Sequence, residues 1–143
     1  ILNIDPDEPL LKAMAAHEAE TLLRDRYSDG GEVPGWAVEM AGAVVEMGLM
    51  VDRNGRFEAA MPITRIEAAV MVSNALKAIP GYEYNPLDLS VFADSAEVPE
   101  WAEEKVENIV VGYLDGTLRP NAEITRAESL TLLLKLFVQG MGW

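Results

Sequence analysis

Two arginines, Arg65 and Arg126, are the residues of this chain best suited to bind an anion. Each stands second in a Thr-Arg-x-Glu tetrapeptide that is predicted to open a helix, in "ITRIE" and in "ITRAE". The first residue of a helix is an unfavourable place for a cation, because the helix dipole is positive there. A guanidinium beside unpaired backbone N–H groups nevertheless offers several donors to a carboxylate. The arginines therefore either bind a carboxylate ligand or pair with a carboxylate of the chain, such as Asp29 or Asp94.

The threonine and the glutamate of each tetrapeptide predict a helix cap. Thr64 and Thr125 fall at the N-cap position, and Glu67 and Glu128 fall at the third helical position. This spacing is that of a capping box, in which each side chain bonds the backbone of the other residue. Capping explains these side chains better than ligand contact does. Thr64 and Thr125 still count as candidate ligand contacts next to the arginines.

Two tryptophans and two glycines are further candidates for contact with a ligand. Trp36 and Trp101 each follow a Val-Pro-x sequence at a predicted helix start. A tryptophan there either fills the space between packed units or offers a flat face to the apolar side of a sugar. Gly55 and Gly116 are predicted to take positive-φ turn positions, with backbone amides within reach of a ligand.

Charge and composition exclude several kinds of partner. With 11 Lys and Arg against 24 Asp and Glu, the net charge is −13, and such a surface repels the phosphates of nucleic acid. The chain has no Cys and a single His, His17, so thiolate and imidazole metal clusters are excluded. The stretch "DRNGRF" resembles a calcium loop, but Met50 and Met61 stand where its first and last carboxylates belong. We expect no nucleic-acid partner, no metal and no cofactor.

Sequence patterns typical of enzymes and membrane proteins are also missing. No nucleophile elbow, Walker loop or dinucleotide fingerprint occurs, and no pair of carboxylates stands out, so we do not expect catalysis. No apolar run approaches the ~20 residues of a membrane span, so we expect no membrane insertion. The first residue is Ile rather than Met, and we expect the chain to be a mature fragment.

Helical spacing of apolar residues predicts five helices joined by loops rich in Gly, Pro, Asn and Asp. The expected helices span residues 5–27, with Asp5 as the N-cap, and then 33–49, 64–79, 98–110 and 125–140. Little of the sequence is typical of strands. The chain is therefore predicted to be all-α.

One pattern occurs twice along the chain. The stretch "YSDGGEVPGWA" aligns with "FADSAEVPEWA", and "NGRFEAAMPITRIE" aligns with "DGTLRPNAEITRAE", which pairs Asp29 with Asp94. The helix that follows Trp101 is more than one turn shorter than the helix that follows Trp36. A single helix-loop-helix unit cannot bury its apolar face, so we expect the repeats to pack together.

These motifs resemble the S-layer homology (SLH) domain family. Residues 92–128 carry most of the family's pattern, with "VVGYLDGTLRP" and "ITRAE" as its most specific parts, and residues 27–76 carry a looser version. Gly112 and Tyr113 complete the family's loop only in the later copy. The resemblance implies three domains: a degenerate partial repeat at 1–27, a repeat with linker at 28–91, and a repeat at 92–143.

The resemblance also implies a fold and a function. SLH repeats form a pseudo-threefold helical bundle and bind a bacterial secondary cell-wall polymer without covalent chemistry, often through a pyruvylated sugar. The implied location is extracellular, at the bacterial cell surface or in the cell wall. Grooves between the repeats would hold the ligand, and the candidate contacts are Arg65, Arg126, Trp36, Trp101, Thr64, Thr125, Gly55, Gly116, Gly112 and Asp94.

Other functions stay open at the level of the sequence. The main alternative is a structural or protein–protein interaction module that keeps the SLH fold without binding glycan. A fragment of a glycan-processing enzyme is a third and more distant alternative. Because the first repeat is incomplete, a second chain could supply the missing half, which would make the protein a homo-oligomer.

Overall fold

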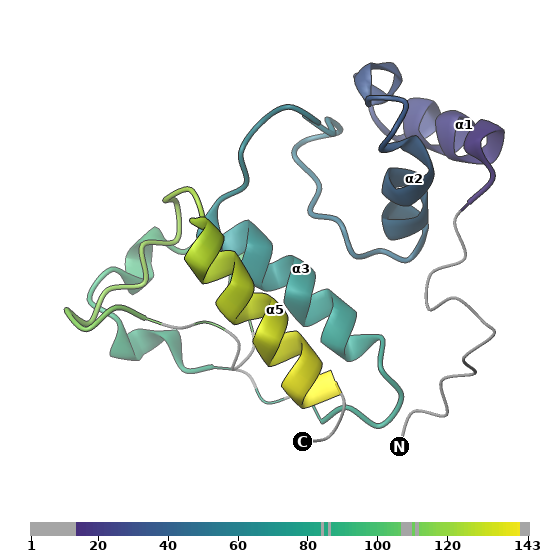
Figure 1. Cartoon of the computed structure of the whole chain (residues 1–143). Coiled ribbons are helices and arrows are strands. Elements are labelled where there is room, and N and C mark those ends of the chain that lie inside the picture. The colour runs from purple at the N-terminus through teal and green to yellow at the C-terminus, as the bar shows by residue number, and fades with distance from the viewer. Residues whose placement is uncertain (1–13, 84, 86, 107–109, 111, 141–143) are drawn as a thin grey trace. The chain divides into compact units, whose positions relative to one another are not determined.

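The computed structural model describes residues 14–83, 85, 87–106, 110 and 112–140 (Figure 1). The chain groups into two compact units, Ile1–Met61 and Pro62–Trp143. The described residues contain helices and no strand, and a single isolated β-bridge joins Thr64 to Glu123. The prediction of an all-α chain is confirmed. The boundary between the two units falls inside the predicted repeat 28–91, and the repeat boundaries stay a prediction.

The first unit packs α1 (Ala16–Arg26) against α2 (Val38–Glu46), with a short 3-10 helix, η1 (Gly30–Glu32), between them. The two helices approach closely at Gly42, where an added Cβ would lie 2.5 Å from the Cβ of Ala19. Buried apolar side chains from the helices and their connecting loop form the core: Ala19, Leu23, Tyr27, Val33, Val38, Ala41 and Val45.

The second unit is built on α3 (Arg65–Lys77) and α5 (Arg126–Gly140), which lie side by side (Figure 1). Between them the chain forms η2 (Leu89–Val91), η3 (Ser95–Glu97) and α4 (Glu100–Glu103). Small residues on α3 bring the two long helices together, and the shared buried cluster consists of Ala68, Ala69, Leu76 and Leu132.

Both predicted capping boxes are present. At the start of α3, the Glu67 N–H donates to the Thr64 hydroxyl at 3.3 Å, and the Thr64 N–H donates to the Glu67 carboxylate at 2.7 Å. At the start of α5, the Glu128 N–H donates to the Thr125 hydroxyl at 3.3 Å, and the Thr125 N–H donates to the Glu128 carboxylate at 2.8 Å. Each box satisfies backbone donors that the first turn of a helix leaves unpaired, and thereby fixes where the helix begins.

The first two helices differ from their predicted spans. Residues 5–13 of the first predicted helix, with its predicted cap, lie outside the described residues. The second helix was expected from residue 33 and begins at Val38. The backbone turns before it, with the Ala37 N–H donating to the carbonyl of Pro34 at 2.8 Å. Pro34 disfavours helical backbone only at Val33, and Gly35 after it is a poor helix former.

The helix predicted at 98–110 begins at Glu100 and ends at Glu103, so its predicted span is wrong, although it is shorter than the helix after Trp36 as predicted. α4 has 4 residues and α2 has 9. Residues 107–109 of the helix predicted at 98–110 lie outside the described residues. The three short 3-10 helices were not predicted, because a single turn leaves no periodic pattern in the sequence.

Asp29 and Asp94 hold the two glycine-containing loops in the same way, each with one carboxylate and two backbone N–H groups. The donors are Phe57 at 2.7 Å and Glu58 at 2.9 Å for Asp29, and Leu118 and Arg119, both at 2.7 Å, for Asp94. The pKa of Asp29 lies below its ordinary value because of these bonds. Burial opposes the effect at Asp94, but the N–H bonds still lower its pKa. Asp29 and Asp94, which align in sequence, thus have equivalent hydrogen bonds in the structure.

The two loop glycines adopt the predicted backbone. Gly55 has φ 75° and Gly116 has φ 78°. Three positions further on, Glu58 and Arg119 also have positive φ, 53° and 54°. This second site of strain was not predicted, and the aspartate that binds each of these N–H groups provides a local reason for it.

Candidate ligand-binding site

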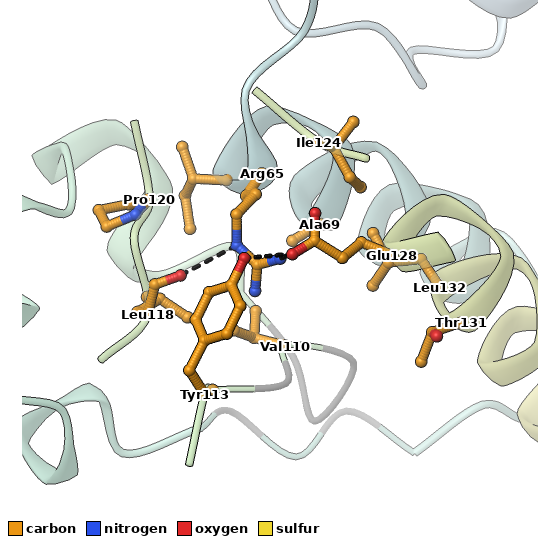
Figure 2. Close-up of a pocket in the computed structure, with 12 residues that line it drawn as sticks. Arg65, Ala69, Val110, Tyr113, Leu118, Pro120, Ile124, Glu128, Thr131 and Leu132 are labelled. Atoms are coloured by element: carbon orange, nitrogen blue, oxygen red, sulfur yellow. Dashed lines mark hydrogen bonds and ion pairs between the residues drawn. The ribbon is translucent and has the colours of Figure 1, made fainter. Parts of the chain in front are cut away.

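A cavity of about 190 Å³ lies in the second unit, at the N-terminal ends of α3 and α5 (Figure 2). The chain that follows Gly112 forms its third wall. Apolar side chains line most of it, and a guanidinium, a phenol and a carboxylate point into it (Figure 2). The apolar walls include Ile66, Ala69, Leu118, Pro120, Ile124 and Leu132.

Arg65 extends its side chain along this cavity from the first residue of α3 (Figure 2). Its Nε donates to the carbonyl of Leu118 at 3.0 Å, and its Nη1 lies 2.5 Å from Oε1 of Glu128. Its backbone N–H donates to the carbonyl of Ala122 at 2.8 Å. The side chain is only 12% exposed, so the guanidinium is fixed in place by partners from the following repeat.

Tyr113 lies between two cations. The Cζ atoms of Arg65 and Arg119 stand 4.6 and 3.9 Å from the centroid of its ring. Its hydroxyl donates to Oε1 of Glu128, and this bond raises the pKa of Tyr113 because ionisation would place two negative charges together. The phenol therefore stays protonated at neutral pH, and its ring orients both guanidinium groups.

The carboxylate of Glu128 is contacted by donors from three residues. Its carboxylate accepts from the Tyr113 hydroxyl, from the N–H and hydroxyl of Thr125, and from the guanidinium of Arg65. The Tyr113 bond is the largest cause, followed by the Thr125 N–H, of a pKa lowered to about 2. Glu128 is thus the capping residue of α5 and the anion that balances Arg65.

Arg126 occupies the equivalent position on α5 but has a different environment. It is exposed, and within the described residues its side chain makes no hydrogen bond or ion pair. The two arginines occupy equivalent positions in the sequence, but Arg65 is enclosed and Arg126 is exposed.

The carboxylates proposed as partners for the arginines were the wrong ones. The carboxylate of Asp94 bonds two backbone N–H groups rather than Arg65 or Arg126. Asp29 does the same and has Arg56 at 3.7 Å. Glu128 is the partner of Arg65, and sequence reasoning had assigned it to the capping box alone. Its two carboxylate oxygens serve both roles at once.

The predicted tryptophans do not line the cavity. Trp36 is 88% exposed, and Trp101 is 41% exposed with Nζ of Lys105 at 5.9 Å from its ring centroid. Both offer an accessible indole face, as a sugar-binding residue must. Neither belongs to the buried cluster of its own unit, and both stay predictions as ligand contacts.

Of the remaining candidates, one lines the cavity, and the others lie in helix caps and loops. Gly112 lines the cavity, and an added Cβ there would lie 2.2 Å from the ring of Phe92. Thr64 and Thr125 cap the two helices that carry the arginines. Gly55 and Gly116 shape loops, each through a carbonyl that accepts the backbone N–H of Ser28 or Ala93. None of these last four is among the residues that line the cavity.

Sequence reasoning missed two groups that the structure places in the site. Leu118 contributes its carbonyl oxygen to Arg65, and no sequence pattern indicates which carbonyl a side chain will meet. Glu128 had a signal, since a glutamate that caps a helix retains a second oxygen for another donor. Within the described residues no helix is long and apolar enough to cross a membrane, and no group of three metal-ligating side chains gathers.

Comparisons with known proteins agree with the repeat. The S-layer homology domain family matches the chain at residues 26–69 and 91–128, together more than half of it. Cell surface glycoprotein 1 of Acetivibrio thermocellus is 33% identical over 94 residues, which are 62% of this chain and 4% of that protein. The Surface-layer 125 kDa protein of Lysinibacillus sphaericus is 29% identical over 119 residues, 82% of this chain and 10% of that protein. The chain thus spans a small part of both relatives. No solved structure matches it.

Proposed function

The chain belongs to the S-layer homology domain family, and from this premise we propose that it anchors a surface protein to the bacterial cell wall by binding a secondary cell-wall polymer. Its family and two relatives named as surface proteins support a location at the cell surface or in the cell wall. The polymer is held without covalent chemistry, through a sugar that carries a carboxylate.

The environment of Arg65 is the observation that carries this proposal. A single guanidinium stands in a mostly apolar cavity, next to the ring of Tyr113. Such a cavity suits a ligand with one carboxylate and several apolar carbon atoms. A pyruvylated sugar has this chemistry, because its ketal places a carboxylate beside a methyl group and a sugar ring. Trp36 and Trp101 are proposed to stack on further sugars of the polymer.

Glu128 competes with the ligand for Arg65, so only a ligand that binds tightly can occupy the site. A carboxylate ligand must take Nη1 of Arg65 from the carboxylate of Glu128. Glu128 then keeps its bonds to Thr125 and Tyr113, which do not involve Arg65. The exchange replaces one ion pair by another, so the gain in affinity comes from the apolar and stacking contacts of the sugar.

The same residues support binding rather than catalysis. A general acid must hold a proton at working pH, and Glu128 with a pKa of about 2 does not. The raised pKa of Tyr113 removes it as a base. At neutral pH Glu128 is therefore ionised and Tyr113 is neutral, and neither exchanges a proton readily.

One observation favours the alternative of a structural module without glycan. Arg65 is already paired with Glu128 and with the carbonyl of Leu118, so its charge also serves the packing of the repeats. A binding assay separates the two functions, because a purely structural arginine affects glycan binding only through the fold.

The deciding experiment measures binding of the purified chain to cell-wall sacculi with and without their secondary polymer. We expect binding only where the polymer is present, and a loss of about tenfold or more for Arg65→Ala and for Arg65→Lys, since lysine cannot form a bidentate pair. Circular dichroism checks that both variants fold. Polymer-independent binding, or full binding by a folded Arg65→Lys variant, would reject the proposed contact.

Glu128→Gln tests the competition directly. Glutamine retains an oxygen for the Thr125 N–H but loses the charge that holds Arg65. We expect this variant, where folded, to bind the polymer more tightly than the parent chain. Weaker binding by folded protein would show that Glu128 assists the ligand instead of competing with it.

A further inference from the structure

Arg119 adjoins the candidate site through the ring of Tyr113. Its Cζ lies 3.9 Å from the centroid of that ring, and it is not among the residues that line the cavity. Two side chains of the same loop hold its guanidinium. Nη2 donates to Oδ2 of Asp115 at 2.7 Å, and Nε donates to the hydroxyl of Thr117 at 3.2 Å. The guanidinium is thereby fixed against the aromatic ring, which favours a cation–π contact.

The hydroxyl of Tyr113 and the guanidinium of Arg65 share one oxygen of Glu128. Both donate to Oε1, whereas Oε2 accepts from Thr125 (Figure 2). When a ligand carboxylate takes Nη1 of Arg65, the Tyr113 hydroxyl is therefore the donor to Oε1 that remains among the described residues. Without this hydroxyl, the liganded site would contain an unpaired carboxylate oxygen at an apolar wall, which is unfavourable.

The earlier loop shows that this arrangement is not needed for the loop to fold. When the two loops are aligned on their glycines, Asp52 corresponds to Tyr113 and Glu58 corresponds to Arg119. Glu58 and Arg119 both have positive φ, and each donates its N–H to the aspartate of its own repeat. The same backbone features thus occur with two acidic residues in place of the phenol and the cation. The contact between Arg119 and Tyr113 therefore requires a reason other than loop geometry.

We propose that Arg119 is a positioning residue for polymer binding, which holds the Tyr113 ring so that its hydroxyl keeps the bond to Glu128 in the liganded state. This role rests on the proposed function and adds to it a residue that does not touch the ligand. The ring contact fixes the direction in which the Tyr113 hydroxyl points. All these side chains belong to the second unit, so the role needs no contact with the first unit.

The first test compares binding to sacculi that carry the secondary polymer. We expect Tyr113→Phe to weaken binding about fivefold, because Oε1 of Glu128 then has no donor in the liganded state. Arg119→Ala should weaken it about threefold, and alanine leaves a non-glycine residue at the positive φ. The double variant should bind within about twofold of Tyr113→Phe, since Arg119 acts through the hydroxyl that this variant lacks. Additive losses in the double variant would overturn the proposal.

Arg119→Lys separates position from charge. Lysine retains the net charge of −13, but its ammonium lacks the fork that bonds Asp115 and Thr117 together. We expect it to bind about as weakly as Arg119→Ala, with urea denaturation confirming that both variants fold. Full binding by Arg119→Lys would show that only the charge matters. If the parent chain binds no polymer, the proposed function fails and this role fails with it. If the parent binds and the Arg119 variants match it, only the role of Arg119 fails.

The second test titrates the phenol of Tyr113 without polymer, by NMR of protein made with ring-labelled tyrosine. Its resonance is identified among those of the four tyrosines by its loss in Tyr113→Phe. The bond to Glu128 raises the pKa of Tyr113, and the charge of Arg119 lowers it. If Arg119 acted by charge alone, Arg119→Ala would raise this pKa further. A positioning role predicts the opposite, because the loosened bond to Glu128 lets the pKa fall toward its ordinary value. A rise, or no change, in folded Arg119→Ala would overturn the proposal.

Discussion

The guanidinium of Arg65 and the carboxylate of Glu128 form an ion pair, with 2.5 Å between Nη1 and Oε1, that joins the first turns of α3 and α5. The arginine belongs to one Thr-Arg-x-Glu tetrapeptide and the glutamate belongs to the next. The two side chains are 12% and 21% exposed, so water screens the pair only in part. One contact therefore closes a wall of the cavity and links two repeats.

Arg65→Ala and Arg126→Ala should differ although the two arginines are equivalent in sequence. Loss of Arg65 leaves the enclosed Glu128 carboxylate without its cation, and we expect the free energy of unfolding to fall by about 2 kcal/mol. Arg126 is exposed, so its loss should change stability by less than about 0.5 kcal/mol. Urea denaturation measures both. Equal effects would mean that the ion pair contributes little to the fold.

Stability should depend on pH through Glu128. Its pKa is about 2 in the folded chain, against an ordinary value of 4.5. Because the folded value is the lower one, the ionised carboxylate stabilises the fold above about pH 4.5, and this contribution is lost as the pH falls toward 2. At neutral pH we expect Glu128→Gln to cost on the order of 2–3 kcal/mol. Urea denaturation at a series of pH values should show the variant and the parent converging in acid.

Asp115 is the control for the pH experiment. Its pKa is also lowered to about 2, by the Thr117 hydroxyl first and then by Arg119. Its side chain is 52% exposed, and an ion pair in water contributes little. We expect Asp115→Asn to leave the pH dependence of unfolding almost unchanged. A loss of that dependence in Asp115→Asn rather than in Glu128→Gln would contradict the role given to Glu128.

Local sequence rules predicted the starts of α3 and α5 and the loop turns, and they did so for physical reasons. A capping box involves residues three apart, so Thr64 and Glu67 signal it without knowledge of the fold. Gly55 and Gly116 signal positive φ because few other residues adopt it easily. The all-α class followed from the same kind of evidence.

The partners across the fold were not predictable in this way. Asp94 was a plausible partner for Arg65 by charge alone, but its carboxylate is engaged by two backbone N–H groups of a distant loop. The choice of Glu128 depends on how α3 lies beside α5, which depends on the packing of Ala69 and Leu132. The cavity forms only when α3 packs against α5. The sequence could therefore indicate single ligand-binding residues, but not which residues line the cavity.

Asp94 should matter for stability through its backbone bonds. Asp94→Ala leaves the N–H of Leu118, in a partly buried bond, and the exposed N–H of Arg119 without their acceptor, and we expect a loss of about 1–2 kcal/mol. Asp94→Asn retains one oxygen and should lose less. Asp88→Ala, which removes one exposed bond to the Ser90 N–H, is a matched control with a small expected effect. If Asp94→Ala unfolds at the urea concentration of the parent chain, the loop does not depend on this carboxylate.

Three glycine-to-alanine variants separate a lack of space from backbone strain. At Gly112 the new Cβ would lie 2.2 Å from the ring of Phe92, so the ring or the cavity-lining backbone at residue 112 must move, and we expect a loss of about 1–3 kcal/mol with weaker polymer binding. At Gly116 there is open space but φ is 78°, and the expected loss is about 1 kcal/mol from strain alone. Gly35 has neither constraint, so Gly35→Ala should be nearly neutral. Thermal and urea unfolding of the three variants give the order, and a Gly112→Ala variant as stable as Gly35→Ala would show that the ring of Phe92 moves aside at little cost.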